Sequence, residues 1–139
     1  VWQDRWMDHA NRAETLEAAI LCADTPAETA TRLSRLAGLP VEPDPAGGFL
    51  LRLPGAARAA GPKAPALETR VRVLTPEALG AVLPGVVPPA SPFMAGMVVR
   101  TADGAASARR ILAGIPTREA PEGIMVPPEY AAGAALIFS

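Results

Sequence analysis

The amino-acid sequence predicts an α+β fold in which two β-α-β-β-β modules form a partly closed, curved sheet around a cavity. Two observations support this fold class. The first is an internal repeat, in which LAGLP at 36–40 returns as LAGIP at 112–116 and Asp24 corresponds to Asp103, with an offset of 76 to 79 residues. The second is that a short apolar run and a helical pattern are followed, in each copy, by further segments of strand length. A period of about half the chain indicates two structural units and not a many-repeat solenoid.

The first copy is expected to occupy residues 16–75. Its apolar run at 18–22 has the length of a buried strand, and the following Asp24 or Thr25 can cap a helix through a side-chain oxygen. Apolar residues then recur at helical spacing until Gly38, which favours the backbone conformation that ends a helix. Further strands are expected at 48–53 and 67–74, with a loop rich in alanine, proline and glycine between them at 54–66.

The second copy repeats this order. A strand is expected around 97–99, a helix begins near Asp103, and Gly123 starts a later strand, as Gly48 does in the first copy. A short helix at 76–83 and a proline-rich turn join the two copies. The predicted segments are therefore an N-terminal linker at 1–15, a first module at 16–75, an inter-module helix and turn at 76–92, and a second module at 93–139 with final strands at 117–119, 123–126 and 133–138.

Composition and charge argue against several classes of function. Thirteen basic and fourteen acidic residues give a net charge of −1, and no long block of either sign could neutralise a row of phosphates, so nucleic acid is not an expected partner. We find no apolar run long enough to span a membrane and no secretion signal. The single cysteine, Cys22, fits a reducing compartment, so the expected location is the cytoplasm. The preference for arginine over lysine is typical of high-GC bacterial genes.

Four segments of the chain carry a family resemblance. They are residues 6–11, the run ADTPAETATRLSRLAG that starts at Ala23, residues 71–76 and residues 133–136. In this order they resemble the glyoxalase-like domain family of bacteria, within the vicinal oxygen chelate superfamily, and the resemblance spans nearly the whole chain. In longer members of that family, a stretch similar to HxN, here residues 9–11, joins an upstream part to this region. The chain therefore resembles the carboxy-terminal part of such a protein.

The resemblance implies two modules around a shared cavity and, in the enzymes of the superfamily, a divalent ion held by His, Gln or Glu at four cavity-facing positions. The matching positions here hold Glu17, Arg72, Gly96 and Ile137. Only Glu17 can bind a cation, and the guanidinium of Arg72 would repel one. The chain also has only one histidine and one cysteine, so carboxylates would have to supply nearly every ligand. We therefore expect no divalent metal and no other cofactor.

Glu17 and Arg72 form the most specific candidate pair. If strand alternation turns the even-numbered residues of 18–22 toward the helix, Glu17 faces the cavity, and Arg72 does so on its own strand. They form either an ion pair where relatives hold metal or two solvated side chains at the cavity mouth. Arg100 shares a face with Val98 and is either an anion-binding group or a solvated strand end. The candidate cavity residues are Glu17, Arg72, Gly96, Val98, Arg100 and Ile137.

Three functions are compatible with these residues. The first is a small-molecule binding domain, or the non-catalytic half of a longer protein, whose cavity takes a small apolar or weakly anionic molecule. The second is a metal-dependent lyase or dioxygenase whose ligands are completed by another chain or by an upstream domain of the same protein. The third is a structural dimerisation module. We expect the first, in which this chain alone is not an enzyme and its protein partner is a second copy or an upstream domain.

Overall fold

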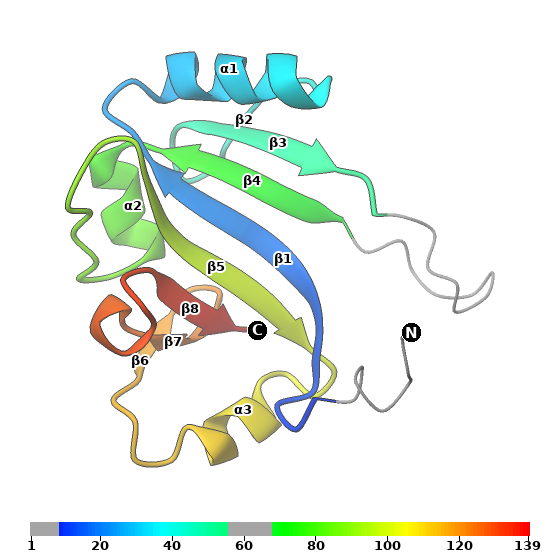
Figure 1. The fold of residues 1–139 in the computed structure, drawn as a ribbon, viewed down its shortest axis with the longest axis vertical. Helices are drawn as coiled ribbons and strands as arrows, with labels where there is room; N and C mark the ends of the chain where they lie inside the picture. Colours follow the sequence, from blue (N-terminus) through cyan, green and yellow to red (C-terminus); the bar gives the residue numbers. More distant parts are fainter. Residues whose placement is uncertain (1–8, 56–67) are drawn as a thin grey trace.

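A computed structural model describes residues 9–55 and 68–139, which contain one eight-stranded sheet with helices packed on it (Figure 1). The strand order in the sheet is β2-β3-β4-β1-β5-β8-β7-β6. No helix in this described part is long and apolar enough to cross a membrane. The elements are β1 (Ala13–Cys22), α1 (Pro26–Ala37), β2 (Glu42–Pro43), β3 (Phe49–Leu53), β4 (Thr69–Leu74), α2 (Pro76–Val82), β5 (Phe93–Thr101), α3 (Ala106–Ile111), β6 (Arg118–Ala120), β7 (Gly123–Val126), the 3-10 helix η2 (Pro128–Tyr130) and β8 (Ala135–Phe138).

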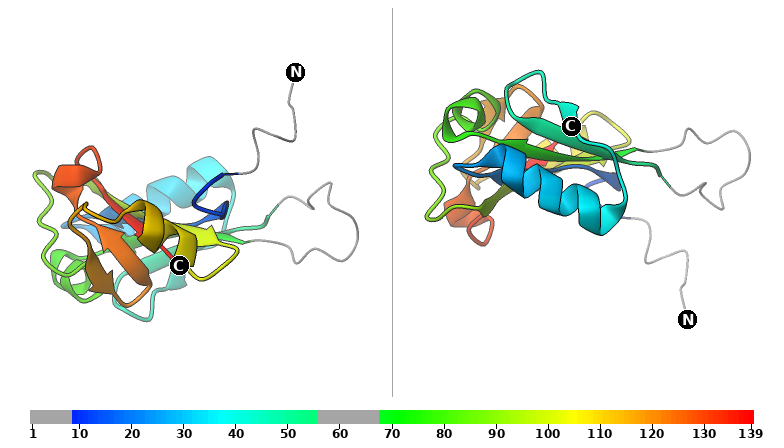
Figure 2. Two further views of the ribbon diagram at one scale, coloured as in Figure 1. Left: turned by 90° about the horizontal axis from the view of Figure 1, so that it is seen from below. Right: turned by 90° about the horizontal axis from the view of Figure 1, so that it is seen from above.

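The sheet consists of two modules with the same order of elements. In each module one strand is followed by a helix and three strands, and the first strand pairs in parallel with the last, β1 with β4 and β5 with β8. The modules join where β1 and β5 pair antiparallel, from Ala13 opposite Thr101 to Cys22 opposite Phe93. Helices α1 and α3 lie at opposite ends of the curved sheet (Figures 1 and 2). The predicted α+β fold with two β-α-β-β-β modules in one curved, unclosed sheet is confirmed.

The predicted elements differ from the observed ones mainly at their ends. The strand expected at 18–22 begins at Ala13, inside the expected linker, because pairing with β5 extends it beyond its apolar half. Of the two alternative caps of α1, Thr25 holds the N-cap position, although its side chain makes no capping hydrogen bond. Asp103 accepts a hydrogen bond from the backbone N–H of Ser107 at the start of α3. The loop expected at 54–66 falls largely outside the described residues.

The inner face of the sheet is filled by the helix that joins the modules. Leu79 of α2 and Leu83 at its end pack with Ile20 of β1 and Ile137 of β8 in one cluster. These four side chains are at most 1% exposed. Burial of large apolar side chains supplies most of the folding free energy of such a domain, so α2 is part of the core and not only a connection.

Helix α1 covers the opposite, outer face of β3 and β4. Its Ala30 packs with Leu51 and Val73 in a separate cluster. The expectation that the even-numbered residues of 18–22 face the helix is wrong, because Ala18, Ile20 and Cys22 all lie in the inner cluster. The physical reason is that α1 is displaced from β1 and packs mainly on the two strands beyond it.

Glu17 nevertheless faces the inner side, because β1 carries a bulge. Leu16 lies opposite Val99 and Ala18 lies opposite Val98, so Glu17 is an extra residue without its own partner in β5. A bulge interrupts the two-residue alternation of a strand. Glu17 and Ala18 can therefore both point to the inner side, where the carboxylate of Glu17 reaches Arg70 of β4.

Two glycines bring one turn of each module against the last strand of that module. Gly48, directly before β3, has a φ of 106°, and Gly123, at the start of β7, has a φ of 138°. A Cβ at Gly48 would lie 2.3 Å from the carbonyl oxygen of Val73 in β4, and one at Gly123 would lie 2.1 Å from the carbonyl oxygen of Phe138 in β8. The aligned glycines of the repeat thus make the same close contact in both copies.

Cys22 is a buried thiol in the inner cluster, with 2% of its surface exposed. Burial, with a contribution from the negative charge of Asp24, raises the pKa of the Cys22 thiol above its ordinary value of 9.0. Because the thiolate is the reactive form, we expect no reaction of the folded protein with Ellman's reagent at neutral pH and complete reaction in guanidinium chloride. Equal reaction rates under the two conditions would contradict this burial.

Candidate functional site

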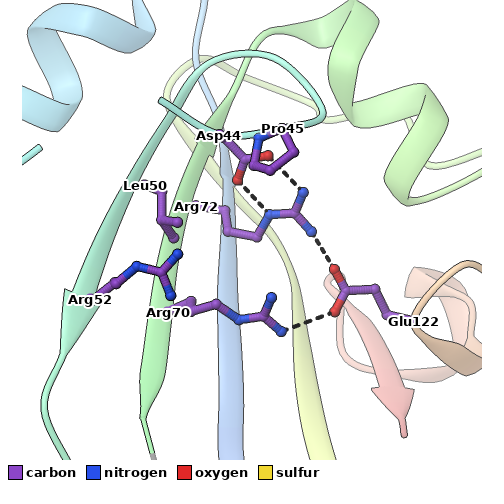
Figure 3. A pocket seen from close by; sticks show the side chains of 7 residues that line it. All are labelled: Asp44, Pro45, Leu50, Arg52, Arg70, Arg72 and Glu122. Atoms are coloured by element: carbon purple, nitrogen blue, oxygen red, sulfur yellow. Dashed lines mark hydrogen bonds and ion pairs between the residues drawn. The ribbon is translucent and has the colours of Figure 1, made fainter. Parts of the chain in front are cut away.

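A cleft of about 270 Å³ opens on the inner face of the first module, beside β3 and β4 (Figure 3). Its basic side chains come from alternate positions of two neighbouring strands, and the register places Arg52 opposite Arg70 and Leu50 opposite Arg72. Alternate residues of a strand share one face, so the pairing of β3 with β4 gathers three guanidinium groups at one wall. The lining residues are Asp44, Pro45, Leu50, Arg52, Arg70, Arg72 and Glu122.

Arg72 is a buried arginine between two carboxylates. Its Nε and Nη2 donate hydrogen bonds to Asp44 at 2.7 and 2.8 Å, and its Nη1 donates to Glu122. The side chains of Arg72 and Asp44 are 8% and 1% exposed. Asp44 lies in the turn between β2 and β3, and Glu122 lies in the turn between β6 and β7. The corresponding turns of the two modules therefore converge on one guanidinium (Figure 3).

Arg70 links this group to a further carboxylate. Its Nη2 donates to Glu17 at 2.8 Å and to Glu122 at 3.4 Å. Glu17 also accepts a hydrogen bond from the hydroxyl of Ser139 at 2.9 Å, and its Oε1 lies 3.3 Å from Nη2 of Arg100. Arg70 keeps 29% of its side chain exposed, whereas Glu17 keeps 16%. A continuous chain of charged groups thus crosses the inner face from one module to the other.

The arginines keep the most buried carboxylates ionised. Burial raises the pKa of Asp44, but the hydrogen bonds from Arg72 and from the backbone N–H of Ala46, together with the charges of Arg72 and Arg70, outweigh burial and hold this pKa below its ordinary value of 3.8. Burial likewise opposes ionisation of Glu17, and its hydrogen-bond partners and neighbouring charges lower its pKa below 4.5. A carboxylate whose pKa is lowered is a weaker base than an ordinary carboxylate. These groups are therefore better suited to fixing arginine side chains than to proton transfer.

Neither of the two alternatives for Glu17 and Arg72 describes this pair, because they do not bind each other and Arg72 is not solvated. Both side chains lie on the inner face, as expected, but Glu17 binds Arg70, and Arg72 binds Asp44. The register explains the difference, because Arg70 lies opposite Ala18, next to Glu17, whereas Arg72 lies two residues further along β4. The chain of contacts joins Glu17 to Arg72 only indirectly.

The other predicted cavity residues lie on the same inner face, but packed side chains fill the space beside all of them except Arg100. Val98 and Ile137 are completely buried in the inner cluster. A Cβ at Gly96 would lie 3.0 Å from the side chain of Leu83. The side chain of Arg100 is 45% exposed and lies at the Glu17 end of the charged chain. The single cavity expected from the sequence is therefore divided, with α2 filling one part and the cleft remaining beside β3 and β4.

Sequence reasoning missed Asp44, Arg52, Arg70 and Glu122. Arg70 had a usable signal, because it lies two residues before Arg72 in a predicted strand and therefore on the same face. Asp44 and Glu122 reach Arg72 across 28 and 50 residues of sequence. Contacts at such separation from two turns leave no local pattern, so only the alignment of the two modules could have suggested them.

The positions at which the family resemblance implies a divalent ion do not fit one in this chain. The guanidinium of Arg72 occupies one of them, and Gly96 and Ile137 carry no donor atom in their side chains. The carboxylate of Glu17 already accepts hydrogen bonds from Arg70 and Ser139. A divalent site usually needs at least three protein ligands. Within residues 9–55 and 68–139, no three or more His, Cys, Asp and Glu side chains are grouped so that they could hold a metal.

Comparison with solved structures finds this fold in methylmalonyl-CoA epimerases. The enzyme from Mycobacterium tuberculosis superimposes with a TM-score of 0.63 at 15% identity, over 98% of this chain and 93% of that one. A variant of the Streptomyces coelicolor enzyme in complex with 2-nitronate-propionyl-CoA gives 0.61 at 13% identity, over 91% and 98%. A methylmalonyl-CoA epimerase in complex with methylmalonyl-CoA and NH4+ gives 0.62 at 13% identity, over 91% and 95%. No protein-family model and no curated protein sequence matches the chain. The chain therefore shares the fold of the methylmalonyl-CoA epimerases.

Proposed function

We propose that this chain is a metal-independent binding domain for a small organic acid, which it holds in the arginine-lined cleft. The observation that carries the proposal is the convergence of Arg52, Arg70 and Arg72 on one cleft of about 270 Å³. Asp44 and Glu122 in the lining, with Glu17, Glu42 and Glu68 beside it, pair with these arginines, so a ligand carboxylate would bind through the guanidinium donors that these partners leave open. Guanidinium groups bind carboxylates through two parallel hydrogen bonds, which supports an anionic ligand.

The three arginines have different degrees of freedom to bind a ligand. Arg72 is almost buried and fixed by Asp44, so it forms the rigid wall of the cleft. The side chains of Arg70 and Arg52 are 29% and 44% exposed. Arg70 uses Nη2 for its described ion pairs, and Arg52 uses Nε and Nη1 for Glu42 and Glu68, so their other guanidinium nitrogens can turn donors toward a bound molecule. Leu50 adds an apolar surface at the same cleft. This combination suits an organic acid that presents a carboxylate beside a short apolar part.

The size of the cleft restricts the ligand further. A volume of about 270 Å³ equals roughly nine water molecules at ~30 Å³ each, which is near the lower end of small-molecule sites. The solved epimerases with this fold hold acyl-CoA molecules, which supports use of the fold for an acyl ligand. The cleft itself is sized for the acid part and not for a whole coenzyme.

The absence of a metal requirement is part of the proposal. Its support is chemical, because a buried guanidinium stands at a position that a cation would need and its charge would repel the ion. A metal-dependent lyase or dioxygenase would require another chain or domain to supply ligands beside Arg72. We therefore expect ligand binding to be unchanged by EDTA.

Isothermal titration with benzoate and succinate, each compared with its uncharged amide, tests the binding function. We expect both acids to bind and both amides to fail, because only the carboxylate accepts the charge-assisted hydrogen bonds. Replacing Arg70 by glutamine should weaken acid binding about tenfold or more, since a hydrogen bond to a charged group contributes on the order of 1.5–3 kcal/mol. Arg109→Gln is the matched control, because this arginine binds Glu119 on the surface and is not among the residues that line the cleft. Equal affinity of acids and amides, or no effect of Arg70→Gln, would refute the proposal.

A further inference from the structure

We propose that Glu122 is a built-in competitor of the ligand, and that its carboxylate occupies the anion position of the cleft until an organic acid displaces it. This inference rests on the proposed function and adds its regulation. Figure 3 shows Glu122 reaching from the other module to the two arginines of β4. The contacts, the weaker attachment of Glu122 compared with Asp44, and the charge balance support the same conclusion.

The contacts of Glu122 are those expected of a bound carboxylate. One oxygen, Oε1, accepts from Arg72, and the other, Oε2, accepts from Arg70 at 3.4 Å. A ligand acid that bridges the same two guanidinium groups would need the same two oxygen positions. The side chain is 19% exposed, so solvent and a ligand can approach it from the cleft.

Asp44 differs from Glu122 in how firmly it is held. The side chain of Asp44 is 1% exposed, it binds Arg72 through both oxygens, and Oδ1 also accepts the backbone N–H of Ala46. Glu122 keeps 19% of its side chain exposed and has no comparable local bond among the described contacts. Asp44 is thus the permanent counter-ion, and Glu122 is the exchangeable one.

The charge balance gives the stoichiometry of the exchange. The connected inner groups comprise three arginines and three carboxylates, which cancel. When Glu122 moves away, one positive charge is left uncompensated, and one ligand carboxylate restores neutrality. One ligand carboxylate therefore replaces each displaced carboxylate of Glu122. The six side chains are Arg70, Arg72 and Arg100 with Glu17, Asp44 and Glu122.

Titration of succinate into Glu122→Gln tests this inference. The amide keeps the size of the side chain but not its charge, so we expect the dissociation constant for succinate to fall about tenfold relative to the unmodified protein. Glu122→Asp keeps the charge on a shorter arm and should give an intermediate affinity. Glu129→Gln is the control, because Glu129 is exposed in η2 and lies 3.8 Å from Arg118, outside the cleft lining. Its affinity for succinate should not change.

The outcomes separate the two proposals. If the unmodified protein and Glu122→Gln bind succinate equally well, the competitor role is wrong and the binding function stands. If Glu122→Gln binds more weakly, Glu122 contributes to the ligand site and the competitor role is also wrong. If neither protein binds succinate or benzoate while circular dichroism shows that both are folded, the binding function itself fails, and the role of Glu122 fails with it.

Discussion

Replacing Arg72 by methionine is expected to lower the free energy of unfolding by about 3–5 kcal/mol, since removing one partner of a buried ion pair leaves the other charge buried and uncompensated. The charge left behind is that of Asp44, whose side chain is 1% exposed and receives two hydrogen bonds from Arg72. The measurement is urea unfolding followed by circular dichroism. The loss should decrease as the pH falls below about 3.8, because the lowered pKa of Asp44 stabilises the native protein only where the unfolded chain has this group ionised.

Two further variants make this prediction specific. Combining Arg72→Met with Asp44→Asn removes the orphaned charge, so the double variant should be more stable than Arg72→Met alone. Arg52→Met removes a neighbouring arginine whose side chain is 44% exposed, and it should change stability little. If Arg72→Met and Arg52→Met unfold at the same urea concentration as the unmodified protein, the buried network does not contribute to stability.

Alanine at Gly48 or Gly123 is expected to destabilise the protein on the order of 3 kcal/mol or more, through a strained φ combined with a backbone clash. The new Cβ would lie 2.3 Å and 2.1 Å, respectively, from a carbonyl oxygen of the neighbouring strand, at φ values of 106° and 138°. Neither obstacle can move without separating β3 from β4 or β7 from β8. Thermal unfolding measures the effect, and the expected result is a large fall in Tm or a failure to fold.

Gly80 supplies the matched control for these substitutions. It lies inside α2 and is not among the residues with positive φ. Apart from its chain neighbours and the backbone of the helix itself, no heavy atom would lie within 4 Å of a Cβ at this position. Alanine is favoured over glycine in a helix interior by about 1 kcal/mol. Gly80→Ala should therefore raise Tm slightly. Similar Tm values for the alanine variants at 48, 80 and 123 would show that the close approach of turn and strand is not required.

The fold was predictable because the sequence contains two copies of the same pattern of strands and helix. Gly48 and Gly123 align in the repeat and make the same contact in the structure, and the LAGLP and LAGIP runs mark the ends of the two helices. The face of β1 was not predictable, because alternation alone does not say where a helix will settle. The displacement of α1 toward β3 and β4 reversed the expected orientation of Ile20.

The site was predictable only in part. The sequence placed Glu17 on the correct face. The prediction relied on regular strand alternation, however, and the bulge in β1 interrupts that alternation, so the reasoning behind it was incomplete. The partners of Arg72 come from two turns that no local pattern connects to β4. The filling of the predicted cavity by Leu79 and Leu83 required knowing that the connecting helix packs on the inner face. Long-range packing decided each of these points.

The antiparallel pairing of β1 with β5 has a consequence for either half on its own. If the two modules were separated there, each would expose an unpaired strand edge of nine or ten residues. Unpaired edges tend to pair with strands of other chains. Because an antiparallel seam is compatible with twofold symmetry, a half could satisfy its edge with an identical copy of itself. The chain thus resembles a dimer of modules that are covalently joined, and joined modules need not keep identical sequences. One module could then keep the open, arginine-lined cleft, while leucine side chains filled the space beside the other module.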